Sequence, residues 1–219
     1  MLPRLALVDP LLTHSMPREV TATTGLDALT QLIESYVSIR ANPLTDPLCL
    51  EGIRRVGRSL KRAWENGTDG SAREDMAMAS LIGGMALANA GLGAAHGFAG
   101  PIGGMFAAPH GAICACLLPH VVAVNSAALQ KRFPESQGLR RYQEVSRILT
   151  GNQNCAADDA IAWVAELCGA LHISSLSSYG VRREHIPPIV EKAAVASSMR
   201  SNPVRLTPDE MQEILALAL

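Results

Sequence analysis

The sequence predicts an all-α domain preceded by one short strand that has no partner strand in the chain. Two observations carry this prediction. After residue 8, no segment shows the apolar–polar alternation that is typical of a sheet. Residues 76–130 contain no Asp, Glu, Lys or Arg, although the chain holds 19 basic and 20 acidic residues. We therefore expect two central helices here that pack closely through their many small residues.

The charge-free stretch is also long enough for two membrane spans. We reject that interpretation because the stretch owes its apolar character to Ala and Gly and includes several His, Asn and Pro residues. The sequence therefore predicts buried core helices and no membrane partner.

Charge and cysteine content exclude two further classes of protein. The net charge is −1 and no Lys/Arg tract occurs, which argues against a nucleic-acid partner. Five cysteines without C-x-x-C spacing, and an N-terminus that lacks a signal-peptide pattern, favour a reduced compartment. We expect the protein in the cytoplasm.

The short strand is predicted at Leu5–Val8, where a β-like run ends in Asp9-Pro10. A lone strand leaves its backbone groups unpaired and is not stable by itself. The strand should therefore pair with something that this chain does not contain, which indicates that the sequence is part of a larger protein.

The first two helices are bounded by clear sequence signals. The first is expected at residues 15–37, because Ser15 and Pro17 are typical of helix starts. Asn42-Pro43 breaks the chain, and a second helix follows from Thr45 to about residue 66. The predicted buried side of this second helix consists of Leu48, Ile53, Val56 and Leu60. Its predicted solvent-facing side consists of Arg54, Arg55, Arg58 and Lys61.

Two capping boxes mark later helix starts. Ser71 and Glu74 predict a helix that begins near residue 72, at the entrance to the charge-free stretch. Thr207 and Glu210 predict the start of the last helix, which should bury its apolar side, formed by Met211, Ile214 and Leu215. In total we expect eight or nine helices.

The first candidate functional residues are Asp27 and Gln31, which share one face of the first helix because they lie four residues apart. Neighbouring leucines indicate that this helix is largely buried. A buried carboxylate requires a compensating cation. That cation is either an Arg or Lys from elsewhere in the fold or a bound metal.

The second candidate group consists of His96 and His110, which lie in the glycine-rich, charge-free segment. Two neutral imidazoles and one carboxylate form a simple site for a divalent transition metal. The ordinary alternative is a buried histidine that bonds a backbone carbonyl. Cys114 and Cys116 point to different sides of a helix and are expected to be small buried apolar groups.

Seven segments, taken in order, carry a resemblance to a known family: ATTGLDALT (22–30), ANPLTD (41–46), AREDMA (72–77), ANAGLG (88–93), PHG (109–111), LLPH (117–120) and SNP with the following LT (201–207). The pattern resembles the iron-containing (group III) alcohol dehydrogenases and covers nearly the whole chain.

The resemblance implies a fold and a division of the chain. The expected fold is the helical C-terminal domain of the dehydroquinate synthase-like, iron-containing alcohol dehydrogenase fold. Residues 1–14 would be a remnant of the last strand and linker of a missing N-terminal domain, and residues 15–219 the all-helical metal-binding domain. In the family, the missing domain binds NAD or NADP through a glycine-rich turn, and no such turn follows a strand here.

The resemblance also implies metal ligands for Fe²⁺ or Zn²⁺. Asp27, His96 and His110 match three of the four ligands in the family. The fourth position is Gln31, whose amide oxygen is a poorer ligand than imidazole. Gly100 stands where many members have a histidine credited with proton transfer.

The function implied is that of an NAD(P)-linked alcohol dehydrogenase or aldehyde reductase, of which this chain is the metal-binding half, inactive without the nucleotide-binding domain. Its substrate would be a small alcohol or aldehyde, and an apolar cleft face predicts a homo-oligomer. Two alternatives stay open. One is a metal-free reductase that resembles the maleylacetate reductases, and the other is a truncated helical module without catalysis.

Overall fold

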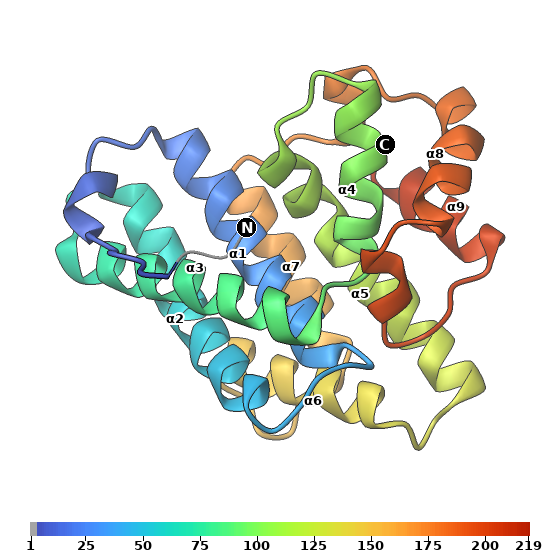
Figure 1. The fold of residues 1–219 in the computed structure, drawn as a ribbon, viewed down its shortest axis with the longest axis horizontal. Coiled ribbons are helices and arrows are strands. Elements are labelled where there is room, and N and C mark those ends of the chain that lie inside the picture. Colours follow the sequence, from blue (N-terminus) through green and yellow to red (C-terminus); the bar gives the residue numbers. More distant parts are fainter. Residues whose placement is uncertain (1–3) are drawn as a thin grey trace.

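The computed structural model describes residues 4–219, and over this range it contains nine α-helices (Figure 1). They are α1 (Arg18–Val37), α2 (Thr45–Glu65), α3 (Gly70–Ala90), α4 (Ala94–Met105), α5 (His110–Arg132), α6 (Gln137–Thr150), α7 (Asp159–Ala170), α8 (Ile186–Ala194) and α9 (Pro208–Leu217). Four short 3-10 helices accompany them: η1 (Pro10–Thr13), η2 (Leu176–Tyr179), η3 (Arg183–His185) and η4 (Ser198–Ser201). The all-α prediction and the predicted number of helices are confirmed.

The predicted strand at residues 5–8 is wrong, because this segment has no regular secondary structure. Leu5 and Leu7 are 87% and 93% exposed. Strand backbone is stable only when a neighbouring strand pairs with it, and no strand lies within residues 4–219. Residues 1–3 of the predicted N-terminal remnant lie outside the described residues, and the division at residue 14 stays a prediction.

Most predicted helix boundaries are confirmed. α1 begins directly after Pro17 and ends at Val37, and α2 runs from Thr45 to Glu65. The capping box of α9 is present: Glu210 N–H donates to Thr207 Oγ1 at 3.2 Å, and Thr207 N–H donates to Glu210 Oε2 at 2.8 Å.

The predicted start of α3 is wrong by two residues. Asp69 caps this helix by accepting a hydrogen bond from the backbone N–H of Ala72 at 3.0 Å, whereas Ser71 lies inside the first turn. Both residues are good capping types. Asp69 also receives a hydrogen bond from Arg62 at 2.8 Å, which Ser71 lacks, and this second contact fixes the loop in front of the helix.

The charge-free stretch forms three helices rather than the predicted two, namely α3, α4 and α5. Gly91 ends α3 with φ of +72°, a left-handed conformation that favours glycine, and the chain bends by 100° into α4. α5 is apolar and long enough to cross a membrane, but 83% of its most apolar window is buried inside the fold. It is a core helix, as predicted.

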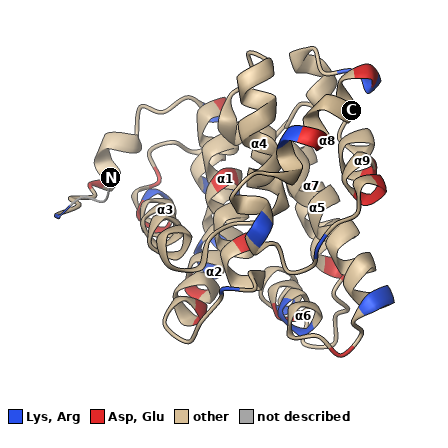
Figure 2. Ribbon diagram, turned by 45° about the vertical axis from the view of Figure 1, so that its right-hand side comes forward, with Lys and Arg blue, Asp and Glu red and all other residues tan. Residues whose placement is uncertain are grey.

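The arrangement of the helices brings distant segments together around α1. α1 packs against α2, α3 and α5, and α4 packs against α5 and α8 (Figure 1). α4 carries no Asp, Glu, Lys or Arg, and its ribbon is uniformly tan in Figure 2. The contact between α4 and α5 therefore lies within the charge-free stretch of the chain.

The charged face of α2 is not entirely exposed to solvent, contrary to the prediction. Arg55 is only 24% exposed and donates to Asp75 Oδ1 at 2.9 Å. Arg58 and Ser59 donate to the same carboxylate at 2.7 and 2.6 Å. Asp75 is buried, so these donors compensate its charge and fasten α2 to α3.

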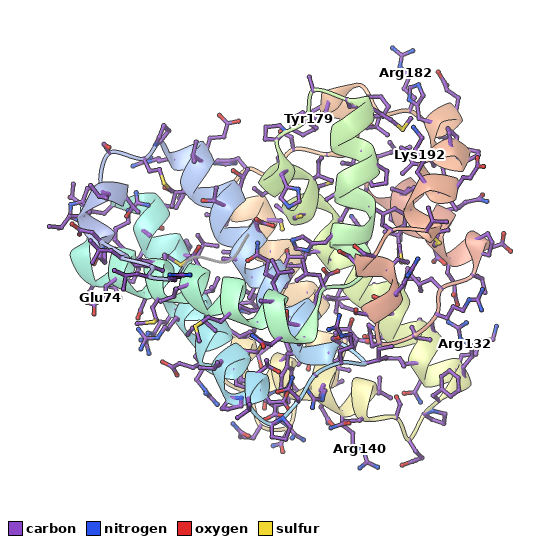
Figure 3. All side chains as sticks on the ribbon, in the orientation of Figure 1. Glu74, Arg132, Arg140, Tyr179, Arg182 and Lys192 are labelled. Atoms are coloured by element: carbon purple, nitrogen blue, oxygen red, sulfur yellow. The ribbon has the colours of Figure 1, made fainter. Side chains whose placement is uncertain are left out.

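The remaining charged side chains mostly lie at the periphery, as Glu74, Arg140 and Arg182 do in Figure 3. A largely apolar cavity of about 890 Å³ lies between the N-terminal segment, α1 and α3. Its lining includes Val8, Met16, Ala28 and Met76 but neither candidate histidine.

Candidate metal centre

One face of α1 carries three polar side chains, Asp27, Gln31 and Glu34, because their spacing of four and three residues places them one above the other. Gln31 Nε2 donates to Asp27 Oδ2 at 3.2 Å. The amide oxygen of Gln31 lies against Gly83 of α3, so close that a Cβ at that position would stand 2.8 Å from it. Gln31 therefore bridges from Asp27 to α3.

Glu34 holds the beginning of α4. Its carboxylate is buried and accepts hydrogen bonds from the backbone N–H groups of Gly93 at 2.9 Å and Ala95 at 2.6 Å. Asn202 Oδ1 accepts the intervening N–H of Ala94 at 3.1 Å. Free N–H groups and the helix dipole at a helix N-terminus favour such an anion. Glu34 thereby fixes the first turn of α4 relative to α1.

His96 lies in this first turn and points back to α1. Its Nδ1 lies 2.8 Å from Glu34 Oε2, and its Nε2 lies 3.3 Å from Asp27 Oδ1. With Nδ1 held by Glu34, Nε2 is the ring nitrogen that faces Asp27. Burial opposes a charged ring, but the hydrogen-bonding groups of Asp27, Cys114 and Glu34 together outweigh it and hold the pKa of His96 above its ordinary value.

α5 supplies two more donors, His110 from its first turn and Cys114 from the second. His110 Nε2 lies 3.7 Å from Asp27 Oδ1, and Cys114 Sγ lies 3.6 Å from His110 Nε2. The His110 side chain is 55% exposed, so the site is open to solvent on this side. Cys114 is fully buried, and burial raises the pKa of its thiol to about 12.

The four donors of Asp27, His96, His110 and Cys114 all lie within 4.8 Å of one another. Two of them, Asp27 Oδ1 and His96 Nε2, are buried and make no hydrogen bond within residues 4–219. Buried polar atoms without a partner are costly, and a shared metal ion would satisfy both. The donor set of carboxylate, imidazole and thiol suits a divalent transition metal.

The cation required by Asp27 is therefore not an Arg or Lys. Within the part of the chain that the structure describes, the ion pairs of Asp27 are with His96 and His110. Burial raises the pKa of Asp27, but His96, Cys114 and His110 together lower it by more, so the carboxylate stays charged. Of the two cations that the sequence left open, the geometry favours a metal bound with these histidines.

Two residues of the site were not found from the sequence. Glu34 follows Asp27 by seven residues on the same helix face, and this spacing could have revealed it. Cys114 follows His110 by four residues, which places both side chains on one face of α5. Gly100 is exposed, and no atom of the described residues lies within 4 Å of the point where its Cβ would stand.

Comparison with known proteins assigns the family. The model of the Fe-containing alcohol dehydrogenase family, C-terminal part, matches residues 21–219. The chain belongs to this family. It is 37% identical to 1,3-propanediol dehydrogenase from Klebsiella pneumoniae over 99% of this chain and 55% of that protein. It is 36% identical to NADPH-dependent butanol dehydrogenase from Clostridium saccharobutylicum over 97% of this chain and 54% of that protein.

Solved structures of family members have the same fold. A crystal structure of 1,3-propanediol oxidoreductase superposes with a TM-score of 0.88 at 36% identity, over 96% of this chain and 55% of that one. The alcohol dehydrogenase from Oenococcus oeni gives a TM-score of 0.86 at 34% identity, over 96% of this chain and 54% of that one. The chain thus spans about half the length of these relatives and matches the C-terminal part of the family.

Proposed function

We propose that this chain is the metal-binding half of an NAD(P)-dependent alcohol dehydrogenase or aldehyde reductase. The observation that carries the proposal is the pair of buried donor atoms, Asp27 Oδ1 and His96 Nε2, which face each other at 3.3 Å without a hydrogen bond, beside the imidazole of His110. The names of the relatives support the reaction class: one is an NADPH-dependent butanol dehydrogenase, and another is a sulfoacetaldehyde reductase in complex with NAD⁺.

Asp27, His96 and His110 would hold the metal, Fe²⁺ or Zn²⁺. When bound, the metal supplies Lewis-acid polarisation of the substrate oxygen for hydride exchange with the nicotinamide. Asp27 offsets part of the positive charge, and Gln31 keeps the Asp27 carboxylate in place through its 3.2 Å hydrogen bond. Glu34 keeps His96 in the tautomer whose Nε2 is free to bind.

The exposed side of His110 is where a substrate would approach. Gly100 offers no proton-transfer group, so water or another side chain would carry the proton of the alcohol. We expect small alcohols or aldehydes as substrates, because the relatives act on such compounds by name. The assembled enzyme would be a cytoplasmic homo-oligomer.

A metal-free reductase is the second candidate function, and Gln31 is the observation that favours it. At the fourth ligand position an amide replaces an imidazole, and its nitrogen, not its oxygen, is directed at Asp27. In this case Gln31 and Gly100 would line an organic-acid or aldehyde pocket.

The test is a chimera in which this chain replaces the matching C-terminal part of 1,3-propanediol dehydrogenase from Klebsiella pneumoniae. The proposal predicts NAD(P)⁺ reduction with 1,3-propanediol that depends on added Fe²⁺ or Zn²⁺ and is abolished by His96→Ala. Circular dichroism and metal content establish that the chimera is folded and carries metal. A folded, metal-loaded chimera that oxidises no alcohol and reduces no aldehyde would refute the proposal. Activity that survives a chelator would favour the metal-free candidate.

A further inference from the structure

We propose that the fourth protein ligand of the metal is Cys114 and not Gln31, the residue at the fourth ligand position of the family. This inference rests on the proposed function, because it takes the metal held by Asp27 and the two histidines as its starting point. Gln31 loses its role as a ligand and becomes the residue that orients Asp27.

The distances between donors support a four-ligand site. Tetrahedral coordination at ordinary zinc bond lengths separates two nitrogen or oxygen donors by about 3.3 Å, and a sulfur from a nitrogen by about 3.6 Å. Three of the six donor pairs are separated by 3.3 Å (His96 Nε2 and Asp27 Oδ1), 3.7 Å (His110 Nε2 and Asp27 Oδ1) and 3.6 Å (Cys114 Sγ and His110 Nε2). The donors of the other three pairs lie within 4.8 Å of each other.

Gln31 is already engaged elsewhere. Its Nε2 donates to Asp27 Oδ2, and only a nitrogen can face a carboxylate at 3.2 Å in this way. Its oxygen consequently lies on the far side, against Gly83 of α3. An amide in this orientation presents no lone pair to a metal between α1, α4 and α5.

Charge balance favours the thiolate as well. The site is largely buried, with Cys114 fully so and the His96 side chain only 6% exposed. The carboxylate of Asp27 and the thiolate together offset the charge of a divalent ion at its own ligands, while the charge of Glu34 is compensated by the N-terminal amides of α4. On binding, the thiol would release its proton to solvent, so metal uptake should liberate protons.

A thiolate also changes which metal is preferred. Soft sulfur ligands favour Zn²⁺, whereas the family set of one carboxylate and three imidazoles contains none. The exchange of a nitrogen donor for sulfur therefore predicts that this chain selects Zn²⁺ over Fe²⁺ more strongly than relatives with the four-ligand family set do.

The experiment is an anaerobic titration of the reduced 219-residue chain with Co²⁺, a spectroscopic substitute for Zn²⁺. Thiolate coordination produces an intense sulfur-to-cobalt charge-transfer band in the near ultraviolet, which oxygen and nitrogen ligands do not produce. The unaltered chain should develop this band as one equivalent of metal is bound. The test variant is Cys114→Ser.

Cys116→Ser is the matched control, since Cys116 is buried on the same helix and its thiol donates to a backbone carbonyl, Ala218 O, at 3.4 Å. Cys114→Ser should lose the band. Its affinity for Co²⁺ should fall by at least about 10- to 100-fold, the loss that follows removal of a group that only orients a ligand. Cys116→Ser should keep both the band and the affinity. Circular dichroism of each variant establishes that it is folded.

Three outcomes overturn the inference, and they are distinguishable. Co²⁺ bound by the unaltered chain without the band means that Cys114 is not a ligand, while the proposed function stands. A band that persists in Cys114→Ser and disappears in Cys116→Ser gives the sulfur ligand to another cysteine. Failure of the folded chain to bind Co²⁺ or Zn²⁺ removes the metal centre and the proposed function together.

Discussion

Replacing the buried carboxylate of Glu34 by an amide, in Glu34→Gln, tests how the site is held together. The carboxylate accepts from three donors: Gly93 N–H and His96 Nδ1 at Oε2, and Ala95 N–H at Oε1. A glutamine of the same shape has only one accepting oxygen. Its NH₂ group must therefore face at least one of these donors, a contact that repels.

The magnitude follows from these contacts. If the amide turns its NH₂ to the Ala95 side, one charge-assisted hydrogen bond is lost and a buried N–H is left unpaired, which costs about 1–3 kcal/mol. Loss of the negative charge at the start of α4 costs about 1 kcal/mol more. We expect about 2–4 kcal/mol of lost stability in the metal-free chain. Affinity for the metal should fall about 10- to 100-fold, because His96 loses the partner that orients it.

The assay is urea unfolding followed by circular dichroism in the presence of a chelator, together with a metal titration of the folded variant. Glu166→Gln on the exposed face of α7 is the control and should change stability by less than about 0.5 kcal/mol. If Glu34→Gln is as stable as this control and binds metal unchanged, Glu34 does not position His96, and the reasoning is refuted.

Two further predictions concern stability. The hydrogen bond from Arg58 lowers the pKa of Asp75 against the opposing effect of burial. The contribution of the Asp75 carboxylate to folding stability is therefore complete above pH 3.8, the ordinary pKa, and is lost as the pH falls through the lower pKa of the folded state. Asp75→Asn should lower stability near neutral pH and flatten the loss of stability in acid, measured by urea unfolding at a series of pH values; an unchanged acid limb would contradict this. Gly91→Ala should cost at least about 1 kcal/mol, because φ is +72° and the new Cβ would meet Ser201 Oγ at 2.8 Å. Gly84→Ala, in an open position inside α3, should instead stabilise the fold by about 0.5–1 kcal/mol. Equal melting temperatures for the two variants would contradict the different backbone requirements of Gly91 and Gly84.

The helical architecture could be predicted because local signals and burial agree. Pro17 and the capping box at Thr207 and Glu210 set helix boundaries by short-range chemistry that needs no tertiary contact. The charge-free stretch similarly identified α5 as a core helix. The start of α3 was missed because Asp69 and Ser71 are both good caps, and the contact with Arg62 of another helix favours the first.

The candidate site could be predicted only in part. Asp27, His96 and His110 follow from residue type and from the resemblance to the family, and the structure brings all three together. The spacing of Glu34 from Asp27 and of Cys114 from His110 places them on the same helix faces, but their roles depend on how α1, α4 and α5 meet, which the spacing does not give. A buried glutamate on an apolar helix is ambiguous until its partners, the N-terminal amides of α4, are in place.

The predicted strand failed for the opposite reason. The run at Leu5–Val8 has strand-like composition, but strand formation requires a pairing partner, and residues 4–219 contain none. Its leucines stay exposed beside the apolar cavity that also touches Ala6 and Val8. Composition alone cannot supply the hydrogen bonds that a strand needs.

Metal content shows most directly whether Asp27, His96 and His110 form a metal centre. The chain is loaded anaerobically with Fe²⁺ or Zn²⁺, desalted and analysed by mass spectrometry beside His96→Ala, Gln31→His and the control His120→Ala, a histidine of α5 outside the cluster. We predict near-stoichiometric metal in the unaltered chain and in His120→Ala, and its loss in His96→Ala. An unaltered chain that stays empty while Gln31→His fills would contradict the account and assign the chain to a metal-free branch.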